Sequence, residues 1–115
     1  MEELDFLKVH TSHPWYGYIR TGLKTIEGRL NRGEFARIKP GDWLEFFNDE
    51  DHFVKVVIAC DIYVSFEEYL TDKGLTDTLP GITSLQDGIN VYYQYYTVED
   101  ERNFGVLALT LQDPK

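Results

Sequence analysis

The chain has 115 residues, a length that fits one domain and leaves little room for two. Its formal net charge is −9, from 20 acidic and 11 basic residues, and 43% of its residues are apolar, enough for one core. A body this negative repels long duplex nucleic acid, because phosphate neutralisation supplies most non-specific affinity, but a short strand or a nucleoside can still bind in a locally basic cleft.

Cysteine use and the N-terminus indicate a soluble, cytoplasmic protein. Cys60 is the one cysteine, so no intrachain disulfide forms, as is usual in a reducing compartment. The acidic start Met1-Glu2-Glu3 does not resemble a secretory signal peptide, and no apolar run is long enough to cross a bilayer. We expect a single domain over residues 1–115.

Five segments have the apolar pattern of strands. They are residues 6–10, 24–30, 43–47, 53–63 and 106–111. In the second segment, Thr25, Glu27 and Arg29 share one face. Strands near both chain ends favour closure of the sheet, because closure removes exposed edges. The expected fold is therefore α+β: a small closed or nearly closed mixed β-barrel with flanking helices.

Helices are predicted after the first strand and in the second half of the chain. Ser12 or His13 caps the first helix, and Gly22 ends it as a left-handed residue. The alternative role of His13 is that of a donor lining a cleft. Residues 75–82 are predicted as a loop. The apolar stripe of the first helix is Trp15, Tyr18 and Ile19, and the later helices start at the caps Ser65, Thr83 or Ser84, and Thr97.

The densest group of chemically useful side chains is in residues 24–29. Lys24, Glu27 and Arg29 place two cations beside one carboxylate, which suits an anionic or amide-bearing ligand and keeps the carboxylate ionised. On a regular strand Lys24 points away from Glu27 unless a bulge turns it. An exposed row of ion pairs on an amphipathic strand would give the same residues.

The stretch Trp15–Leu30 resembles the ASCH domain signature. In that signature a helix ending in glycine leads into G-x-K-x-x-E-x-R, here residues 22–29. Residues 38–46 resemble the family's hydrophobic-x-x-G-D entry to its next strand, and the stretches 92–101 and 105–109 are also similar to small bacterial and viral ASCH proteins. ASCH domains are similar to PUA domains. The resemblance implies a β-barrel with a cleft that faces RNA or a nucleoside.

The same resemblance raises hydrolysis as an alternative. Some ASCH relatives are small amidohydrolases acting on N4-acetylcytidine, and others cleave RNA. In the amidohydrolase branch a lysine activates a threonine three positions later, with help from a distant glutamate. Lys24 matches that lysine, but Glu27 stands where the threonine would be, and Thr25 is adjacent to Lys24. An enzyme of this kind would use Lys24 as base and Glu27 as acid or to orient water.

Aromatic residues complete the candidate site. Trp15 is either a stacking surface for a base or the core anchor of the first helix. The tyrosines between residues 92 and 96 cover more than one helix face, so one or two of their hydroxyls are expected to reach the cleft. The candidate ligand-binding residues are Trp15, Lys24, Thr25, Glu27, Arg29 and Tyr93.

Neither a metal nor a cofactor is expected. His10, His13 and His52 are too dispersed for a metal site. The first hypothesis for the partner is single-stranded RNA or a modified nucleoside. A hydrolase substrate in the same cleft is the second, and a basic protein attracted by the acidic surface is the third.

Overall fold

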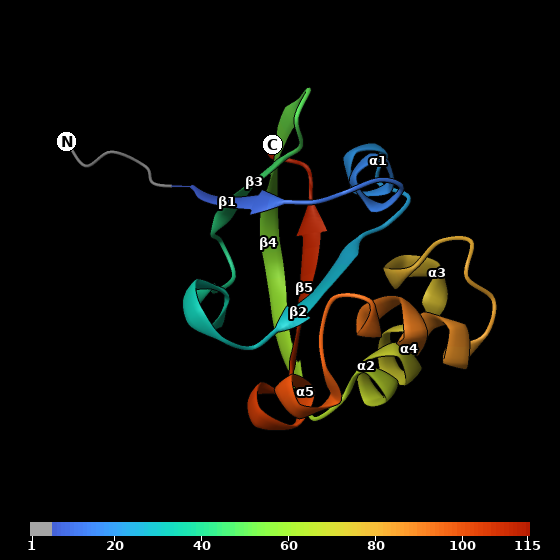
Figure 1. The fold of residues 1–115 in the computed structure, drawn as a ribbon. Helices are drawn as coiled ribbons and strands as arrows, with labels where there is room; N and C mark the ends of the chain where they lie inside the picture. The colour runs from blue at the N-terminus through green and yellow to red at the C-terminus, as the bar shows by residue number, and fades with distance from the viewer. Residues whose placement is uncertain (1–5) are drawn as a thin grey trace.

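Residues 6–115 are described by a computed structural model, which has an α+β fold (Figure 1). Five strands form one sheet in the order β1-β3-β4-β5-β2. β1 pairs with β3 in parallel, and the other pairs are antiparallel. The strands are β1 (Leu7–His10), β2 (Ile26–Leu30), β3 (Trp43–Phe47), β4 (His52–Tyr63) and β5 (Val106–Gln112). The sheet is strongly curled into a half-barrel, which confirms the expected fold class.

The curl depends on the long strand β4. Its first part pairs with β3, and its second part pairs with β5. The register shifts between Val57 and Ala59, and such a bulge bends a strand and increases its twist. The curl brings the two edge strands together. Arg29 of β2 donates from Nη2 to the carbonyl oxygen of His10, the last residue of β1, over 3.1 Å. We call this junction of β1 and β2 the seam.

Helices pack on both faces of the sheet. They are α1 (Trp15–Thr21), the 3-10 helix η1 (Gly33–Arg37), α2 (Phe66–Lys73), α3 (Leu75–Thr78), α4 (Leu85–Tyr93) and α5 (Val98–Phe104). The caps Ser65, Ser84 and Thr97 are confirmed, since each side chain accepts from a backbone N–H three residues later. None of the helices in the described part of the chain is long and apolar enough to cross a membrane.

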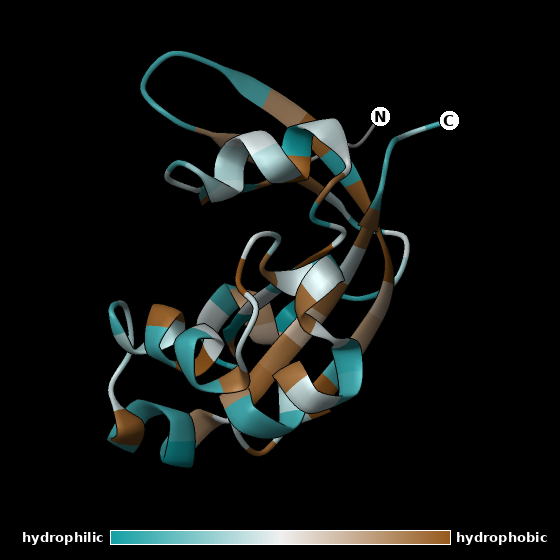
Figure 2. Ribbon diagram, turned by 90° about the vertical axis from the view of Figure 1, so that its right-hand side faces the viewer, coloured by the Kyte–Doolittle hydropathy of each residue, from teal (hydrophilic) through white to brown (hydrophobic). Residues whose placement is uncertain are grey.

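Two hydrophobic clusters lie on opposite faces of the sheet. The first gathers buried side chains of β1, β3, β4 and β5 under α1, among them Phe46, Val57 and Leu109. The second joins β2 and β5 to α2 and α4 through Tyr69 and Tyr92, among others. In Figure 2 the hydrophobic stretches run along the central strands, with α1 on one side and the group α2–α5 on the other.

The first helix differs from its prediction in two ways. Neither Ser12 nor His13 caps it: Pro14 occupies the N-cap position and no side chain bonds there. The predicted stripe is also wrong in part, because Tyr16 and Ile19 are the buried residues of α1 and pack into the first cluster. Trp15 instead packs against the second cluster, on the other side of the helix. Gly22 ends the helix with φ of 86°, as predicted.

The strand predicted over residues 24–30 is shorter, and part of the predicted loop is helical. β2 begins at Ile26, since the N–H groups of Lys24 and Thr25 donate to Tyr18 and Asp77 outside the sheet. Residues 75–78 form the single turn α3, with the N–H of Leu79 donating to Leu75. This turn matters for the site because it places a carbonyl group above Lys24.

Candidate functional site

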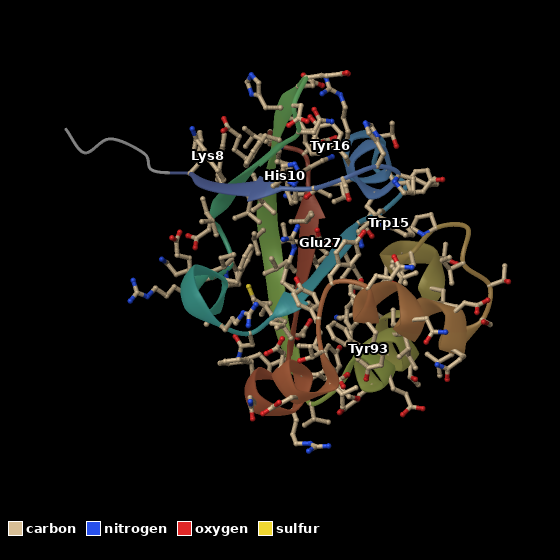
Figure 3. The ribbon with its side chains drawn as sticks, in the orientation of Figure 1. Lys8, His10, Trp15, Tyr16, Glu27 and Tyr93 are labelled. Atoms are coloured by element: carbon tan, nitrogen blue, oxygen red, sulfur yellow. The ribbon has the colours of Figure 1, made fainter. Side chains whose placement is uncertain are left out.

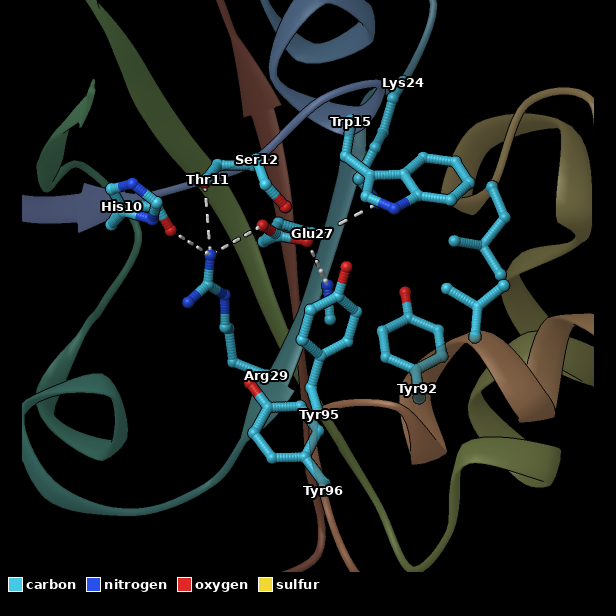
Figure 4. Close-up of a pocket in the computed structure, with 13 residues that line it drawn as sticks. His10, Thr11, Ser12, Trp15, Lys24, Glu27, Arg29, Tyr92, Tyr95 and Tyr96 are labelled. Atoms are coloured by element: carbon cyan, nitrogen blue, oxygen red, sulfur yellow. Dashed lines mark hydrogen bonds and ion pairs between the residues drawn. The ribbon is translucent and has the colours of Figure 1, made fainter. Parts of the chain in front are cut away.

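A cavity of about 180 Å³ opens beside β2, between α1 and the chain at the end of α4 (Figure 4). Four of the six predicted ligand-binding residues line it: Trp15, Lys24, Glu27 and Arg29. β2 is an edge strand, so its free side is available to side chains rather than to another strand. The cavity therefore lies at the seam.

Lys24 reaches Glu27 even though regular strand geometry would separate them. Lys24 precedes β2, and its Nζ lies 3.5 Å from Oε1 of Glu27. The same ammonium donates to the carbonyl oxygen of Ile26 over 2.6 Å and to the carbonyl oxygen of Thr78. The side chain of Lys24 is only 1% exposed. Three oxygen acceptors around one buried nitrogen match the three donors of a protonated lysine.

Glu27 lies between the two cations. Oε2 accepts from Nη2 of Arg29 over 3.1 Å, and Oε1 accepts from the N–H of Gly28 over 3.1 Å in addition to its contact with Lys24. Arg29 also donates to Oγ1 of Thr11 over 3.2 Å. A carboxylate has about four acceptor positions, so Glu27 keeps capacity for one more donor.

Burial and the neighbouring charges shift the pKa values of the three ionisable groups. Burial alone would raise the pKa of Glu27, but the positive charges of Arg29 and Lys24 outweigh burial, and the net pKa is lowered. Burial lowers the pKa of Lys24, and Glu27 offsets only part of this effect. For Arg29, Glu27 outweighs burial and the pKa is raised. The group thus holds an ionised carboxylate at neutral pH.

The opposite wall of the cavity is aromatic. Tyr92, Tyr95 and Tyr96 line it from the end of α4 and the segment that follows (Figure 4). The hydroxyl of Tyr92 lies 2.9 Å from the hydroxyl of Tyr69, which is fully buried. Burial raises the pKa of Tyr92 well beyond its ordinary value, and the negative charge of Glu27 adds to the effect. Both hydroxyls therefore stay protonated and can donate hydrogen bonds.

Two predicted residues lie elsewhere. Thr25 does not line the cavity, and its carbonyl oxygen accepts from Leu111 of β5. Tyr93 points away from Glu27, among the helices (Figure 3), and its hydroxyl donates to Oε1 of Glu101 over 2.6 Å. That carboxylate raises the pKa of Tyr93 to about 12. The two side chains belong to the framework around the site.

Sequence reasoning missed the contribution of the β1 end of the seam. His10 and Thr11 line the cavity and accept from Arg29. For the tyrosines of residues 92–96, the sequence predicts only that one or two hydroxyls reach the cleft, without saying which. In the structure Tyr92, Tyr95 and Tyr96 line the cavity. Tyr92 belongs to the last turn of α4, which ends at Tyr93, whereas Tyr95 and Tyr96 line the cavity from the segment after the helix.

Within residues 6–115, no group of three or more His, Cys, Asp or Glu side chains is arranged to hold a metal ion. Cys60 is a free, partly exposed thiol, and burial raises its pKa. The side chains that line the cavity include a lysine, a carboxylate, a guanidinium, an imidazole, two aliphatic hydroxyls and aromatic rings.

The half-barrel with flanking helices and a cavity at its seam is a PUA-like fold. The ASCH domain family model matches residues 9–115, so the chain belongs to the ASCH domain family and the resemblance seen in the sequence is confirmed.

Two solved structures are similar over nearly their whole length. The crystal structure of hypothetical protein PH0355 is 32% identical, with a TM-score of 0.87, and the match covers 94% of this chain and 98% of that one. The solution NMR structure of protein PF0455 from Pyrococcus furiosus is 33% identical, with a TM-score of 0.78, and covers 94% of this chain and 96% of that one. A search of the curated proteins finds no significant match.

Proposed function

We propose that the cavity binds one base of a single-stranded RNA or of a modified nucleoside. ASCH domains are generally associated with RNA binding, which supports the class of ligand. The observation that carries the proposal is the meeting of Lys24, Glu27 and Arg29 in a concave site faced by aromatic rings. The volume of about 180 Å³ lies below the roughly 300 Å³ at which drug-sized pockets begin, so the base enters while the sugar stays at the mouth.

Hydrogen bonding predicts which bases are preferred. Glu27 has one acceptor position left, which suits an exocyclic amino group. Either hydroxyl of the buried Tyr69–Tyr92 pair can donate to the other, and when Tyr69 donates, the proton of Tyr92 is free for an acceptor on the base. Bases that carry an amino group beside an acceptor fit this pair. Uracil lacks the amino group and is expected to bind more weakly.

Stacking supplies most of the affinity in this proposal. Trp15 lies on one side of the cavity, and the ring of Tyr95 lies on the other (Figure 4). Tyr95 is 57% exposed, unlike the buried Tyr92, so its ring is free to meet a ligand. Stacking of a base on an aromatic side chain contributes about 1–3 kcal/mol.

Tryptophan fluorescence tests the proposal. The chain has two tryptophans, so Trp43→Phe leaves Trp15 as the sole reporter. We expect cytidine to quench it with saturation and uridine to bind more weakly. Tyr95→Leu is expected to weaken cytidine binding at least about fivefold. Tyr93→Leu, a change of the same kind outside the cavity, is the control and leaves binding unchanged. The experiment is repeated with adenosine and guanosine. If none of the four nucleosides quenches the fluorescence at millimolar concentration, the proposal is refuted.

Hydrolysis in the same cavity is the second candidate. The lowered pKa of the buried Lys24 amine favours it, because a lysine with a lowered pKa is the better general base. The three oxygens around Nζ oppose it, because loss of a proton leaves one of them without a donor. Binding is therefore the first proposal and turnover the second.

Product analysis separates the two. A hydrolase is expected to convert N4-acetylcytidine to cytidine and acetate, or to shorten an RNA oligonucleotide, over hours at micromolar enzyme. Chromatography detects either product. Lys24→Ala should abolish the turnover, and turnover that survives this change would show that Lys24 is not the base.

A further inference from the structure

We propose that a single strand of RNA continues from the cavity across a basic strip on the η1 side of the barrel. The strip consists of Lys8, Arg32, Arg37 and Lys39, with the exposed ring of Trp43 beside it. This inference rests on the proposed function and extends it, because it names an oligonucleotide rather than a free nucleoside as the partner. A free nucleoside would occupy the cavity alone.

Charge is distributed very unevenly along this chain. Residues 29–39 contain four basic residues and one acidic residue, a net charge of +3 in a chain whose total is −9. Arg32, Arg37 and Lys39 are exposed, and so is Lys8 on β1 (Figure 3). The strip is therefore the part of an acidic molecule where phosphates would be attracted.

The cations of the strip are available to a ligand. Lys8, Arg32 and Lys39 have long ion pairs, of 4.0 Å to Glu45, 3.8 Å to Asp100 and 3.6 Å to Asp42. Such pairs contribute little and exchange readily for other anions. The guanidinium of Arg32 also lies 5.4 Å from the ring centroid of Phe104. Arg37 has no ion pair with any residue from 6 to 115. By contrast, Lys24 and Lys55 are buried and already paired.

The strip is continuous with the cavity. The guanidinium of Arg29, which touches the cavity, lies 5.3 Å from the ring centroid of Phe35 in η1. Phe35, Lys8 and Arg32 line one shallow depression on the surface. Lys39 and Trp43 line a second depression, and the two share residues at the start of β1. A strand leaving the cavity past Arg29 therefore meets these cations in succession.

Trp43 adds a stacking surface at the far end. Trp43 is 41% exposed, and its ring stacks on Phe6, with centroids 5.6 Å apart and planes 13° from parallel. A positively charged groove with an exposed aromatic ring is the combination that single-strand binders use, over about four nucleotides or more. The exposed ring of Trp43 therefore offers a stacking surface to a base of the RNA.

The experiment measures how affinity for RNA depends on salt. A 5′-fluorescein RNA octamer containing all four bases is titrated by anisotropy at several salt concentrations. The proteins are the wild type, the strip variant Arg37→Gln/Lys39→Gln, and the control Lys73→Gln/Lys115→Gln. The control removes the same charge from α2, on the other face of the sheet, and from the chain end. Cytidine binding is measured on all three proteins.

The strip variant is expected to bind the octamer more weakly. Its slope of log K against log salt should be less negative by about 1.4, since each phosphate contact on a single strand contributes about −0.7. The control should keep the wild-type slope, and all three should bind cytidine equally. Equal slopes in the strip variant and the control would overturn the strip. If octamer binding depends on the strip but cytidine does not bind to any of the proteins, the role of the strip is supported and base binding in the cavity is refuted.

Discussion

Glu27 is the residue on which the charges of the site depend. It is a buried carboxylate that accepts from Arg29 and the N–H of Gly28 and forms an ion pair with Lys24. Its replacement by glutamine leaves two largely buried cations without a counter-charge. Removing one partner of a buried ion pair costs about 3–5 kcal/mol, so Glu27→Gln is expected to lower the free energy of unfolding by about 3 kcal/mol at pH 7. Urea unfolding measures it, with Glu50→Gln at an exposed turn as the near-neutral control.

The same carboxylate predicts a dependence of stability on pH. The pKa of Glu27 in the folded state is below its ordinary value of 4.5, so the folded protein binds this proton less readily than the unfolded chain does. Its stabilisation is present in full above about pH 4.5 and is lost as the pH falls through the lowered pKa. The difference in unfolding free energy between wild type and Glu27→Gln should be constant above about pH 5 and shrink below pH 4. A difference that does not change down to pH 3 would contradict this assignment.

Gly28 is required by a close approach. A Cβ built at this position would lie 2.7 Å from the ring of Tyr69, which is fully buried and cannot move aside. We expect Gly28→Ala to destabilise the protein by about 1–3 kcal/mol and to displace the Tyr69–Tyr92 pair. Gly17→Ala on α1, where nothing lies within 4 Å, is the matched control and should be neutral or stabilising. Equal thermal midpoints for the two variants would refute the steric argument.

At the level of elements, the seam is closed by a side chain. Arg29 on β2 donates to His10 and Thr11 at the end of β1, where a complete barrel would have strand pairing. These bonds and the bond to Glu27 all come from Nη2, and the lysine side chain, one bond shorter, does not carry its nitrogen as far. Arg29→Lys is therefore expected to speed amide hydrogen exchange in residues 9–12 and leave β4 and β5 unchanged. If the amides of residues 9–12 exchange at the same rates in the variant and in the wild type, the seam does not depend on this contact.

Elements with strong local signals were predictable from the sequence. The strand at residues 43–47 and the caps at Ser65, Ser84 and Thr97 are found where the pattern indicates. The turn α3 was not, because a single turn carries little periodicity. Regular strand geometry predicts that Lys24 points away from Glu27 unless a bulge turns it, and the structure differs because Lys24 precedes β2 and donates to Thr78 and Ile26.

For the whole molecule, the fold followed from the pattern of strands and the family signature, whereas the shape of the cavity did not. The Lys24–Glu27–Arg29 group is local in sequence and was found. The rest of the cavity wall comes from the start of the chain and from residues 92–96, and its position depends on how α1 and α4 pack. Tyr93, chosen from the same tyrosine run, points elsewhere for this reason.

Intermolecular NOEs between cytidine and the protein test most directly whether a base enters the cavity at the seam. We expect contacts from the H5 and H6 protons of the base to the ring protons of Trp15 and Tyr95, with amide shifts concentrated in β2 around Glu27. Contacts that lie only outside these residues, or an absence of any contact at millimolar cytidine, would contradict it.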